Sequence, residues 1–155
     1  MIPGRVNSYR FEVAEAGVYR GQCAEFCGEQ HAKMAFFVVA TARDEFEACY
    51  AVQAAPAPKP ALPELVYGQE RFIANGCGAC HRVRGTAADG EIGPDLTYVG
   101  GRVSLAAGEL PNNVGTLAGW IASSQHVKPG NLMPSFDNLA GSELRAIAAY
   151  LESLK

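Results

Sequence analysis

Two short segments of this chain carry residues that bind redox metals. Residues 77–81 read Cys-Gly-Ala-Cys-His, and an upstream loop holds Cys23, Cys27, His31 and Met34. Thiolate, imidazole and thioether groups are soft donors that select copper over hard cations such as magnesium. A C-x-x-C-H segment is the attachment pattern of a c-type haem. Together the two segments indicate electron transfer rather than hydrolysis or simple binding.

The C-x-x-C-H segment predicts a covalently attached haem. Cys77 and Cys80 are spaced to bond the two vinyl groups of one haem, and His81 then falls beneath the iron. A zinc or thiol-redox site is the alternative for a C-x-x-C pair. Met133 is the candidate sixth ligand, because it lies in a Gly/Pro loop where core packing explains a methionine poorly, and the proline after it favours extended backbone. His/Met ligation leaves the iron no open position, which suits electron transfer.

The upstream loop predicts a copper centre rich in sulfur. Cys23 and Cys27 are four residues apart, His31 follows after four more, and Met34 after a further three. A bare C-x-x-x-C pair more often forms a disulfide or two buried thiols, and a methionine is usually a core filler. The imidazole and the thioether at these spacings favour metal binding over both alternatives.

Composition limits the protein class. With 155 residues, 48% hydrophobic and 19% charged, the chain is globular and has room for one ordinary domain or two small ones. A net charge of −3 lacks the basic excess of nucleic-acid-binding proteins, so no nucleic acid is expected as a partner. A weakly acidic surface suits a basic protein partner, but an ordinary solvated surface carries the same charge. The odd number of cysteines argues against a pure disulfide framework and leaves Cys49 over.

The metal chemistry also implies a location. C-type haem is attached outside the bacterial cytoplasm, so we expect the chain to act on the outer face of a membrane. Residues 1–5 have no apolar core of a signal peptide, and no run of about 18 apolar residues exists to span a membrane. The sequence is therefore expected to be truncated at its N-terminus.

The copper loop, residues 21–34, is expected to connect two strands. Residues 8–13 alternate and predict a strand, residues 17–20 continue it after a turn, and residues 35–41 predict a strand buried on both faces. Thr41 is expected to cap a helix whose first turn is acidic. On that helix Cys49 is expected to be a buried small hydrophobe.

A proline-rich linker divides the chain. Residues 54–63 contain four prolines, which predict an extended tether holding two modules at an effective concentration on the order of millimolar. Beyond it, residues 65–75 predict a helix before the haem segment. A middle helix is expected after Thr116, and a last helix, capped by Ser142, ends the chain.

The segment after the linker resembles the class I cytochromes c. The matching features are Gly68-x-x-x-Phe72, Cys77 to His81, Gly93-Pro94-Asp95-Leu96, the Trp120 region, Met133-Pro134 and Ala149-Tyr150-Leu151. The resemblance implies that the first and last helices cross with Gly68 against Tyr150. It also implies that the Pro94 carbonyl accepts the N–H of the His81 ring. Arg102 is a candidate partner of a haem propionate, with an ordinary exposed arginine as the alternative.

The upstream loop resembles the dinuclear copper (CuA) site of cytochrome c oxidase subunit II, whose pattern is C-x-E-x-C-x-x-x-H-x-x-M. The resemblance implies that Cys23 and Cys27 bridge two coppers and that His31 binds one of them. It implies a weak axial role for Met34 and ligation by Glu25 through its backbone carbonyl. The pattern is highly specific.

One ligand of that family has no counterpart here. The family's other histidine lies on an earlier strand, before anything in this sequence. The first strands of the barrel and the two membrane helices of the family would also precede this sequence. His126 is expected to be a surface or pocket residue rather than the replacement ligand. As written, the copper site is incomplete in this chain.

These resemblances imply a multidomain fold. Residues 1–53 are expected to be the C-terminal portion of a β cupredoxin (CuA) domain, and residues 64–155 an all-α class I cytochrome c domain. That fusion is the arrangement of caa3-type oxidases. It implies that haem c takes electrons from a cytochrome c or another donor and passes them to the CuA copper. Subunit I of the oxidase then reduces oxygen to water and pumps protons.

The same resemblance implies the setting of the chain. Its partners are subunit I and the other oxidase subunits, and it is held to the cell membrane, on the periplasmic or extracytoplasmic face, by helices upstream of this sequence. No catalytic residue for oxygen chemistry is expected in it. A free-standing c-type cytochrome with a vestigial copper loop is the alternative. A copper-delivery or thiol-redox module is a third hypothesis, which the haem tethered beside the loop disfavours.

Overall fold

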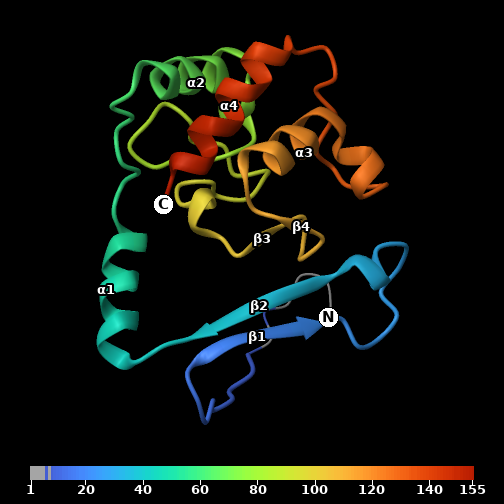
Figure 1. Cartoon of the computed structure of the whole chain (residues 1–155). Helices are drawn as coiled ribbons and strands as arrows, with labels where there is room; N and C mark the ends of the chain where they lie inside the picture. The colour runs from blue at the N-terminus through green and yellow to red at the C-terminus, as the bar shows by residue number, and fades with distance from the viewer. Residues whose placement is uncertain (1–5, 7) are drawn as a thin grey trace.

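The computed structural model describes residue 6 and residues 8–155, and Figure 1 shows two parts joined along one side by a helix and an extended segment. The first part is an antiparallel hairpin followed by that helix: β1 (Gly17–Gln22), β2 (Ala35–Ala40) and α1 (Arg43–Ala54). The opening residues 1–5, in which no signal peptide was recognised, lie outside the described residues.

The second part is helical and lies above the hairpin in Figure 1. Its helices and its short two-stranded sheet are α2 (Pro63–Ala74), β3 (Ser104–Leu105), β4 (Leu110–Pro111), α3 (Val114–Val127) and α4 (Gly141–Ser153). One hydrophobic core fills it, and its largest buried side chains are Tyr150, Phe72, Ile147 and Leu154. Two parts of different secondary structure confirm a multidomain layout.

The crossing of α2 and α4 organises the helical part. At Gly68 an added Cβ would meet the Ala146 carbonyl oxygen and lie 2.8 Å from the Tyr150 Cβ. Glycine is therefore required for the two backbones to come this close. The rings of Phe72 and Tyr150 pack beside the crossing, with their centroids 6.0 Å apart. The predicted contact of Gly68 with Tyr150 is confirmed.

The helices form as predicted, but their caps differ. The N-cap of α3 is Asn113, whose side chain accepts the Thr116 N–H at 3.0 Å while the Thr116 hydroxyl accepts the Asn113 N–H. This reciprocal capping box places Thr116 inside the helix, so the predicted start was wrong. Thr41 and Ser142 do not cap their helices either, since α1 and α4 begin after alanines and have no side-chain cap.

The hairpin matches the prediction in topology but not in burial. Strands β1 and β2 pair from Gly17 opposite Ala40 to Gln22 opposite Ala35, so the copper loop does connect two strands. Residues 8–13 form no strand, and the prediction of one was wrong. Strand β2 was expected to be buried on both faces, yet Phe36 is 60% exposed. A stable strand needs hydrogen-bonded neighbours and a covered face. Within the described chain, β1 and β2 pair only with each other, and no further strand or helix covers the face that carries Phe36.

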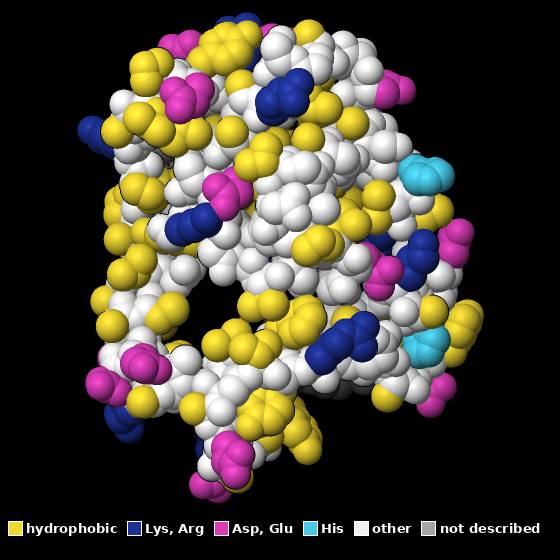
Figure 2. All heavy atoms as spheres, in the orientation of Figure 1, with side chains coloured by type: hydrophobic (Ala, Val, Ile, Leu, Met, Phe, Trp, Pro, Cys, Tyr) yellow, Lys and Arg dark blue, Asp and Glu magenta, His cyan; other side chains and the backbone are white. Residues whose placement is uncertain are grey.

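The predicted buried position of Cys49 was also wrong. Its thiol is exposed on α1, beside Phe46 and Tyr50, which are 56% and 64% exposed. No element of the described chain covers this face of the helix. Figure 2 shows an opening through the molecule, with α1 along one side of it.

The linker is held against the helical part. The Arg84 guanidinium donates to the carbonyl oxygens of Gln53 at 2.6 Å and Ala54 at 3.2 Å, at the C-terminal end of α1. A cation at this end satisfies free carbonyls and complements the helix dipole. The Tyr98 hydroxyl donates to the Pro56 carbonyl oxygen at 3.0 Å. The segment between α1 and α2, which was predicted to be an extended tether, is thus held in place as a strap.

Membrane anchoring finds no support within the described helices. None of them is both long enough and apolar enough to cross a bilayer.

We predict that Gly68→Ala destabilises the haem-loaded protein by about 1–3 kcal/mol, because the added methyl group overpacks the helix crossing. The matched control is Gly119→Ala in α3, where an added Cβ meets nothing within 4 Å. That substitution should be neutral or stabilise by up to about 1 kcal/mol through helix propensity. Urea unfolding followed by circular dichroism measures both. Equal effects at the two sites would contradict the role of the crossing.

Candidate metal centres

The hairpin brings the two ends of the copper loop together. One step beyond the last strand pair, the Cys23 N–H donates to the Met34 carbonyl oxygen at 3.0 Å. The Gln22 side-chain amide donates to the same oxygen, also at 3.0 Å. Because antiparallel pairing fixes which residues stand opposite each other, the strand register sets the distance between the first and last predicted copper ligands.

A tight turn folds the middle of the loop inward. Gly28 has a backbone φ of +123°, a value that side chains rarely allow, and its carbonyl oxygen accepts the His31 N–H at 3.0 Å. A 3₁₀ turn over His31–Lys33 then leads into β2. The imidazole is thereby turned back toward the cysteines.

The soft donors predicted from the sequence converge. The Cys27 sulfur lies 3.5 Å from the Cys23 sulfur, 3.9 Å from the His31 Nδ1 and 3.9 Å from the Met34 sulfur. The ligand atoms of Cys23, Cys27 and His31 all lie within 4.8 Å of one another. A cluster of thiols, imidazole and thioether fits copper, which such donors prefer.

The two thiols are not joined. Their separation of 3.5 Å far exceeds a disulfide bond of about 2.05 Å, so the disulfide alternative finds no support. The hydrogen bond with Cys23, together with partial desolvation and the nearby Cys23 charge, raises the pKa of the Cys27 thiol. Two thiolates this close repel each other, and a soft cation would remove that repulsion.

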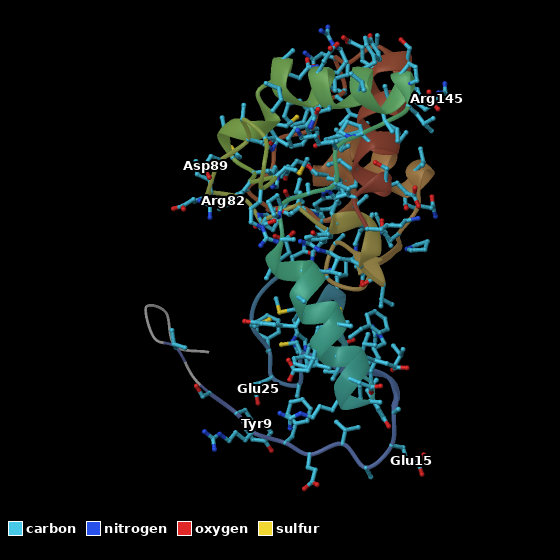
Figure 3. The ribbon with its side chains drawn as sticks, turned by 90° about the vertical axis from the view of Figure 1, so that its left-hand side faces the viewer. Tyr9, Glu15, Glu25, Arg82, Asp89 and Arg145 are labelled. Carbon is cyan, nitrogen blue, oxygen red and sulfur yellow. The ribbon has the colours of Figure 1, made fainter. Side chains whose placement is uncertain are left out.

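Glu25 contacts the cluster through its backbone and not through its side chain. Its carbonyl oxygen accepts the Cys23 S–H at 3.3 Å, whereas its carboxylate accepts the Phe26 N–H at 3.2 Å. Figure 3 shows the Glu25 side chain at the outside of the hairpin part. This placement is compatible with the predicted ligation by the carbonyl. Phe26, which sequence reasoning did not single out, places its exposed ring 5.7 Å from the His31 imidazole.

A second imidazole does not join the cluster from the described chain. His126 lies on α3 and is exposed, and His81 belongs to the haem segment. The metal-binding group found among the described residues consists of Cys23, Cys27 and His31. The donor set thus fits copper but provides one nitrogen ligand where the CuA pattern has two.

The haem segment follows directly from α2. Gly76, with a φ of +75°, ends that helix, and a 3₁₀ turn over Cys77–Ala79 presents the first thiol. The His81 N–H donates to the Cys77 carbonyl oxygen at 3.0 Å, which keeps the imidazole next to the thiols in one compact turn. Burial raises the pKa of the Cys77 thiol. Cys77 also packs against the hydrophobic core of the helical part.

The His81 ring is held as the cytochrome resemblance implies. Its Nδ1 lies 2.8 Å from the Pro94 carbonyl oxygen, which confirms the predicted contact. A carbonyl can only accept, so Nδ1 carries the proton and Nε2 is left for a metal. Gly93 makes room for the ring, because a Cβ there would lie 2.5 Å from the His81 Cε1. The residues around this histidine therefore fit a haem ligand.

Met133 is fixed by its backbone. Its carbonyl oxygen accepts hydrogen bonds from the Ser124 hydroxyl and the Gln125 side chain, each at 2.8 Å. Its N–H donates to the Asn131 side-chain oxygen at 2.8 Å. The thioether packs against the same core as Cys77, while Leu132 beside it is 95% exposed. Sequence reasoning missed the supporting residues, although an Asn two positions before Met133 is a recognisable turn signal.

Arg102 contacts protein in this structure. Its guanidinium donates to the Asp95 carbonyl oxygen, and a cavity of about 260 Å³ lies beside it, lined by Gln53, Arg84, Asp95, Tyr98, Gly101 and Arg102. Burial opposes ionisation of Asp95, but hydrogen bonds from Thr97 and the charges of Arg84 and Arg102 outweigh it and lower the pKa. Pairing of Arg102 with a haem propionate stays a prediction.

Comparison with known families agrees with both segments. Residues 65–155 match the family described as Cytochrome c, and residues 1–41 match the family described as Cytochrome C oxidase subunit II, periplasmic domain. The resemblance inferred from the two motifs is therefore confirmed.

Similar proteins combine the two segments. "Cytochrome c oxidase subunit 2" of Alkalihalophilus pseudofirmus is 38% identical over 99% of this chain and 44% of its own length. Proteins of the same name from Bacillus sp. strain PS3 and Bacillus subtilis are 35% and 32% identical, over 90% and 91% of this chain and 40% and 41% of theirs. The chain thus spans less than half the length of these relatives.

We predict that Cys27→Ser abolishes the thiolate-to-copper charge-transfer absorption that appears when Cu(II) is added with free imidazole. The Cys27 sulfur contacts the donor atoms of Cys23, His31 and Met34, so its loss disrupts the whole cluster. Cys49→Ser is the matched control, because that thiol is exposed on α1 outside the cluster. An equal loss of absorption in both variants would contradict the assignment.

We also predict that Gly93→Ala pushes the His81 ring away from the Pro94 carbonyl. The haem-loaded variant should lose about 1–3 kcal/mol of unfolding free energy and show a shifted haem midpoint potential. Gly101→Ala, where the nearest atom to an added Cβ is 3.9 Å away, should change neither. Urea unfolding and a spectroscopic redox titration check this, and an unshifted potential in Gly93→Ala would refute it.

Proposed function

We propose that this chain, which belongs to the cytochrome c family through residues 65–155, is the electron-accepting part of a haem-copper cytochrome c oxidase subunit II. In this proposal residues 64–155 form a cytochrome c domain and residues 54–63 form the linker. Residues 1–53 form the C-terminal portion of a cupredoxin domain. When bound, haem c and a dinuclear copper centre supply the one-electron chemistry of the chain.

The chain's own residues hold and orient these groups. Cys77 and Cys80 would attach one haem covalently, and His81 and Met133 would ligate its iron. The Pro94 carbonyl fixes the tautomer and the angle of the His81 ring. With both His81 and Met133 as ligands, the iron would have no open position for water or oxygen, which would restrict the site to electron transfer.

The hairpin loop performs the same task for copper. Cys23, Cys27 and His31 would hold the copper, Met34 would be a weak ligand, and Glu25 would contribute its backbone carbonyl. Because the loop ends are tied by the strand register, the donors move little when the charge of the site changes. A stiff donor set favours fast electron exchange.

The observation that carries the proposal is that the part holding the copper donors and the part holding the haem donors belong to one chain and contact each other directly. The Gln30 side chain in the copper loop donates to the Pro129 carbonyl oxygen at 2.6 Å. The amide N–H of Ala35 in β2 donates to the Ala107 carbonyl oxygen at 2.8 Å. A free electron carrier with a vestigial loop has no need of this contact.

The exposed apolar surface of the hairpin supports the cupredoxin assignment. Val18, Phe36 and Val39 are each more than half exposed on a sheet of only two strands. Side chains of this kind are covered in a complete two-layer β domain. We propose that the remaining strands of the domain, with the second histidine ligand, cover them in the assembled subunit.

The proposal places the chain at the outer, periplasmic or extracytoplasmic, face of the cell membrane. Electrons arrive from a cytochrome c or another donor. They leave to subunit I, where oxygen is reduced to water and protons are pumped. No described residue of this chain is proposed to take part in the oxygen chemistry.

The test is electron transfer within the chain. The protein is produced with c-type haem attachment and loaded with copper in the presence of imidazole, which replaces the absent nitrogen ligand. Flash reduction by a light-activated donor should produce ferrous haem first. One electron then leaves that haem and reduces the copper, so the two absorption changes share one rate that does not depend on protein concentration.

Cys27→Ser is the control, because it removes copper and leaves the haem intact. A copper signal that rises at a concentration-dependent rate would show transfer between molecules. A chain that holds haem but forms no thiolate-bound copper would overturn the proposal in favour of the free cytochrome.

A further inference from the structure

One buried charge lies between the two candidate metal centres. Lys128 directly follows α3 and is only 9% exposed, and it is the one acidic or basic side chain that is buried among the described residues. Removing an ammonium group from water is costly unless partners compensate for the lost solvation. Core packing alone does not explain a lysine in this place.

Its ammonium group contacts the copper loop. The Lys128 Nζ donates to the Lys33 carbonyl oxygen at 2.8 Å, and Lys33 immediately precedes the predicted ligand Met34. No carboxylate in the described part of the chain forms an ion pair with Lys128. The positive charge is therefore held by a backbone dipole and is not neutralised.

Its backbone contacts the haem side. The Lys128 carbonyl oxygen accepts the Asn131 side-chain N–H at 2.7 Å, and the Asn131 side-chain oxygen accepts the Met133 N–H at 2.8 Å. Together with the contact to Lys33, these hydrogen bonds form a continuous route. It begins one peptide bond from Met34 and ends on Met133 itself.

Neighbouring contacts keep this junction closed. The Lys33 side chain donates to the Val127 carbonyl oxygen at 3.3 Å, so the two segments exchange hydrogen bonds in both directions. The turn whose Ala107 carbonyl oxygen accepts the Ala35 N–H of β2 is strained, because Ala106 and Ala107 have φ values of +52° and +59°. Such backbone costs free energy in non-glycine residues and persists only where the surroundings impose it.

We propose that Lys128 is the positioning residue that couples the two centres. It fixes the copper loop against the loop of the haem ligand Met133, and its charge acts on both sites. The inference rests on the proposed function and deepens it. A hydrogen-bonded route transmits electrons better than a gap of equal length, and hydrogen-bonded networks reinforce one another in low dielectric.

Two consequences separate this role from a purely structural one. A positive charge stabilises whichever centre has gained an electron, so its removal should lower the haem midpoint potential. Loss of the Lys33 contact should also loosen the copper loop and slow electron transfer to it. A lysine that only filled space would change neither the potential nor the rate.

The experiment compares Lys128→Met with Arg145→Met. Arg145 lies on α4 and is exposed, and Figure 3 shows it at the far end of the molecule from the hairpin part. Both variants lose one positive charge, but only Lys128→Met loses the junction. Lys128→Arg keeps the charge and a donor and should restore part of the effect.

Three readouts are taken. In the haem-loaded, copper-free protein, Lys128→Met should reduce hydrogen-exchange protection of residues 29–36 about tenfold, as expected for the loss of a charged hydrogen bond. Redox titration of the same sample should give a lower haem potential. In the copper-loaded protein, the flash experiment should show electron transfer slowed severalfold, with Arg145→Met unchanged in all three.

The outcomes are separable from those of the proposed function. If the unmodified protein fails to transfer electrons, the proposed function fails; if it transfers them and Lys128→Met does so equally fast, only the coupling role fails. Reduced protection with an unchanged potential and rate would make Lys128 a structural contact and overturn the inference. If Lys128→Met does not load haem, Lys128→Gln carries the same three expectations.

Discussion

The close crossing of α2 and α4 at Gly68 is the contact on which the haem segment depends. It brings Phe72 and Tyr150 into one buried pair and leaves α2 pointing into the turn that carries Cys77. The hydrophobic core of the helical part is built around this crossing, so the close approach of the two backbones and the burial of apolar area depend on each other. A methyl group at Gly68 would push α2 away from α4 and would thereby displace the turn that carries Cys77.

The hairpin part follows a different rule. Val18, Phe36 and Phe46 are largely exposed, so apolar burial cannot hold this part in place within the described chain. Polar contacts to backbone hold it instead: Arg84 at the end of α1, and the exchange between Lys33 and residues 127–128. Such hydrogen bonds contribute only about 1 kcal/mol each to stability, but they form only in a narrow range of geometries. They therefore fix the orientation of the hairpin part more than they stabilise it. In the proposed function, this part has to place the copper donors at a set distance from the haem.

Sequence reasoning succeeded where chemistry dictates spacing. The C-x-x-C-H turn and the convergence of Cys23, Cys27, His31 and Met34 follow from what a haem and a thiolate-bound copper require. The contact of His81 with Pro94 was expected from the resemblance to the class I cytochromes c. Sequence reasoning also placed the helices of the second part, because the apolar periodicity of α4 reflects packing along a single segment. The crossing at Gly68 came from the resemblance to the class I cytochromes c.

It failed where structure depends on distant partners. Residues 8–13 alternate like a strand but have no neighbour in the described chain, and Cys49 has an apolar helical pattern but nothing packed over it. Local propensity cannot report whether the covering layer is present. The strap could not be foreseen from its prolines either, because its position is decided by Arg84 and Tyr98, some 30 to 40 residues further along.

Lys128 shows the same limit in its strongest form. In the sequence it is an ordinary lysine before a Pro-Gly turn, and exposure is the natural expectation for such a residue. Only the folded chain brings the Lys33 carbonyl within 2.8 Å of its ammonium group, across about 95 residues of sequence. If copper and haem bind as proposed, a loose junction would let the distance between them vary, and electron transfer falls steeply with distance. The buried Lys128 ammonium group can donate to the Lys33 carbonyl oxygen in only one arrangement of the two segments, so it narrows the range of distances between the two centres. The desolvation cost of Lys128 is therefore consistent with selection for a fixed spacing rather than for stability.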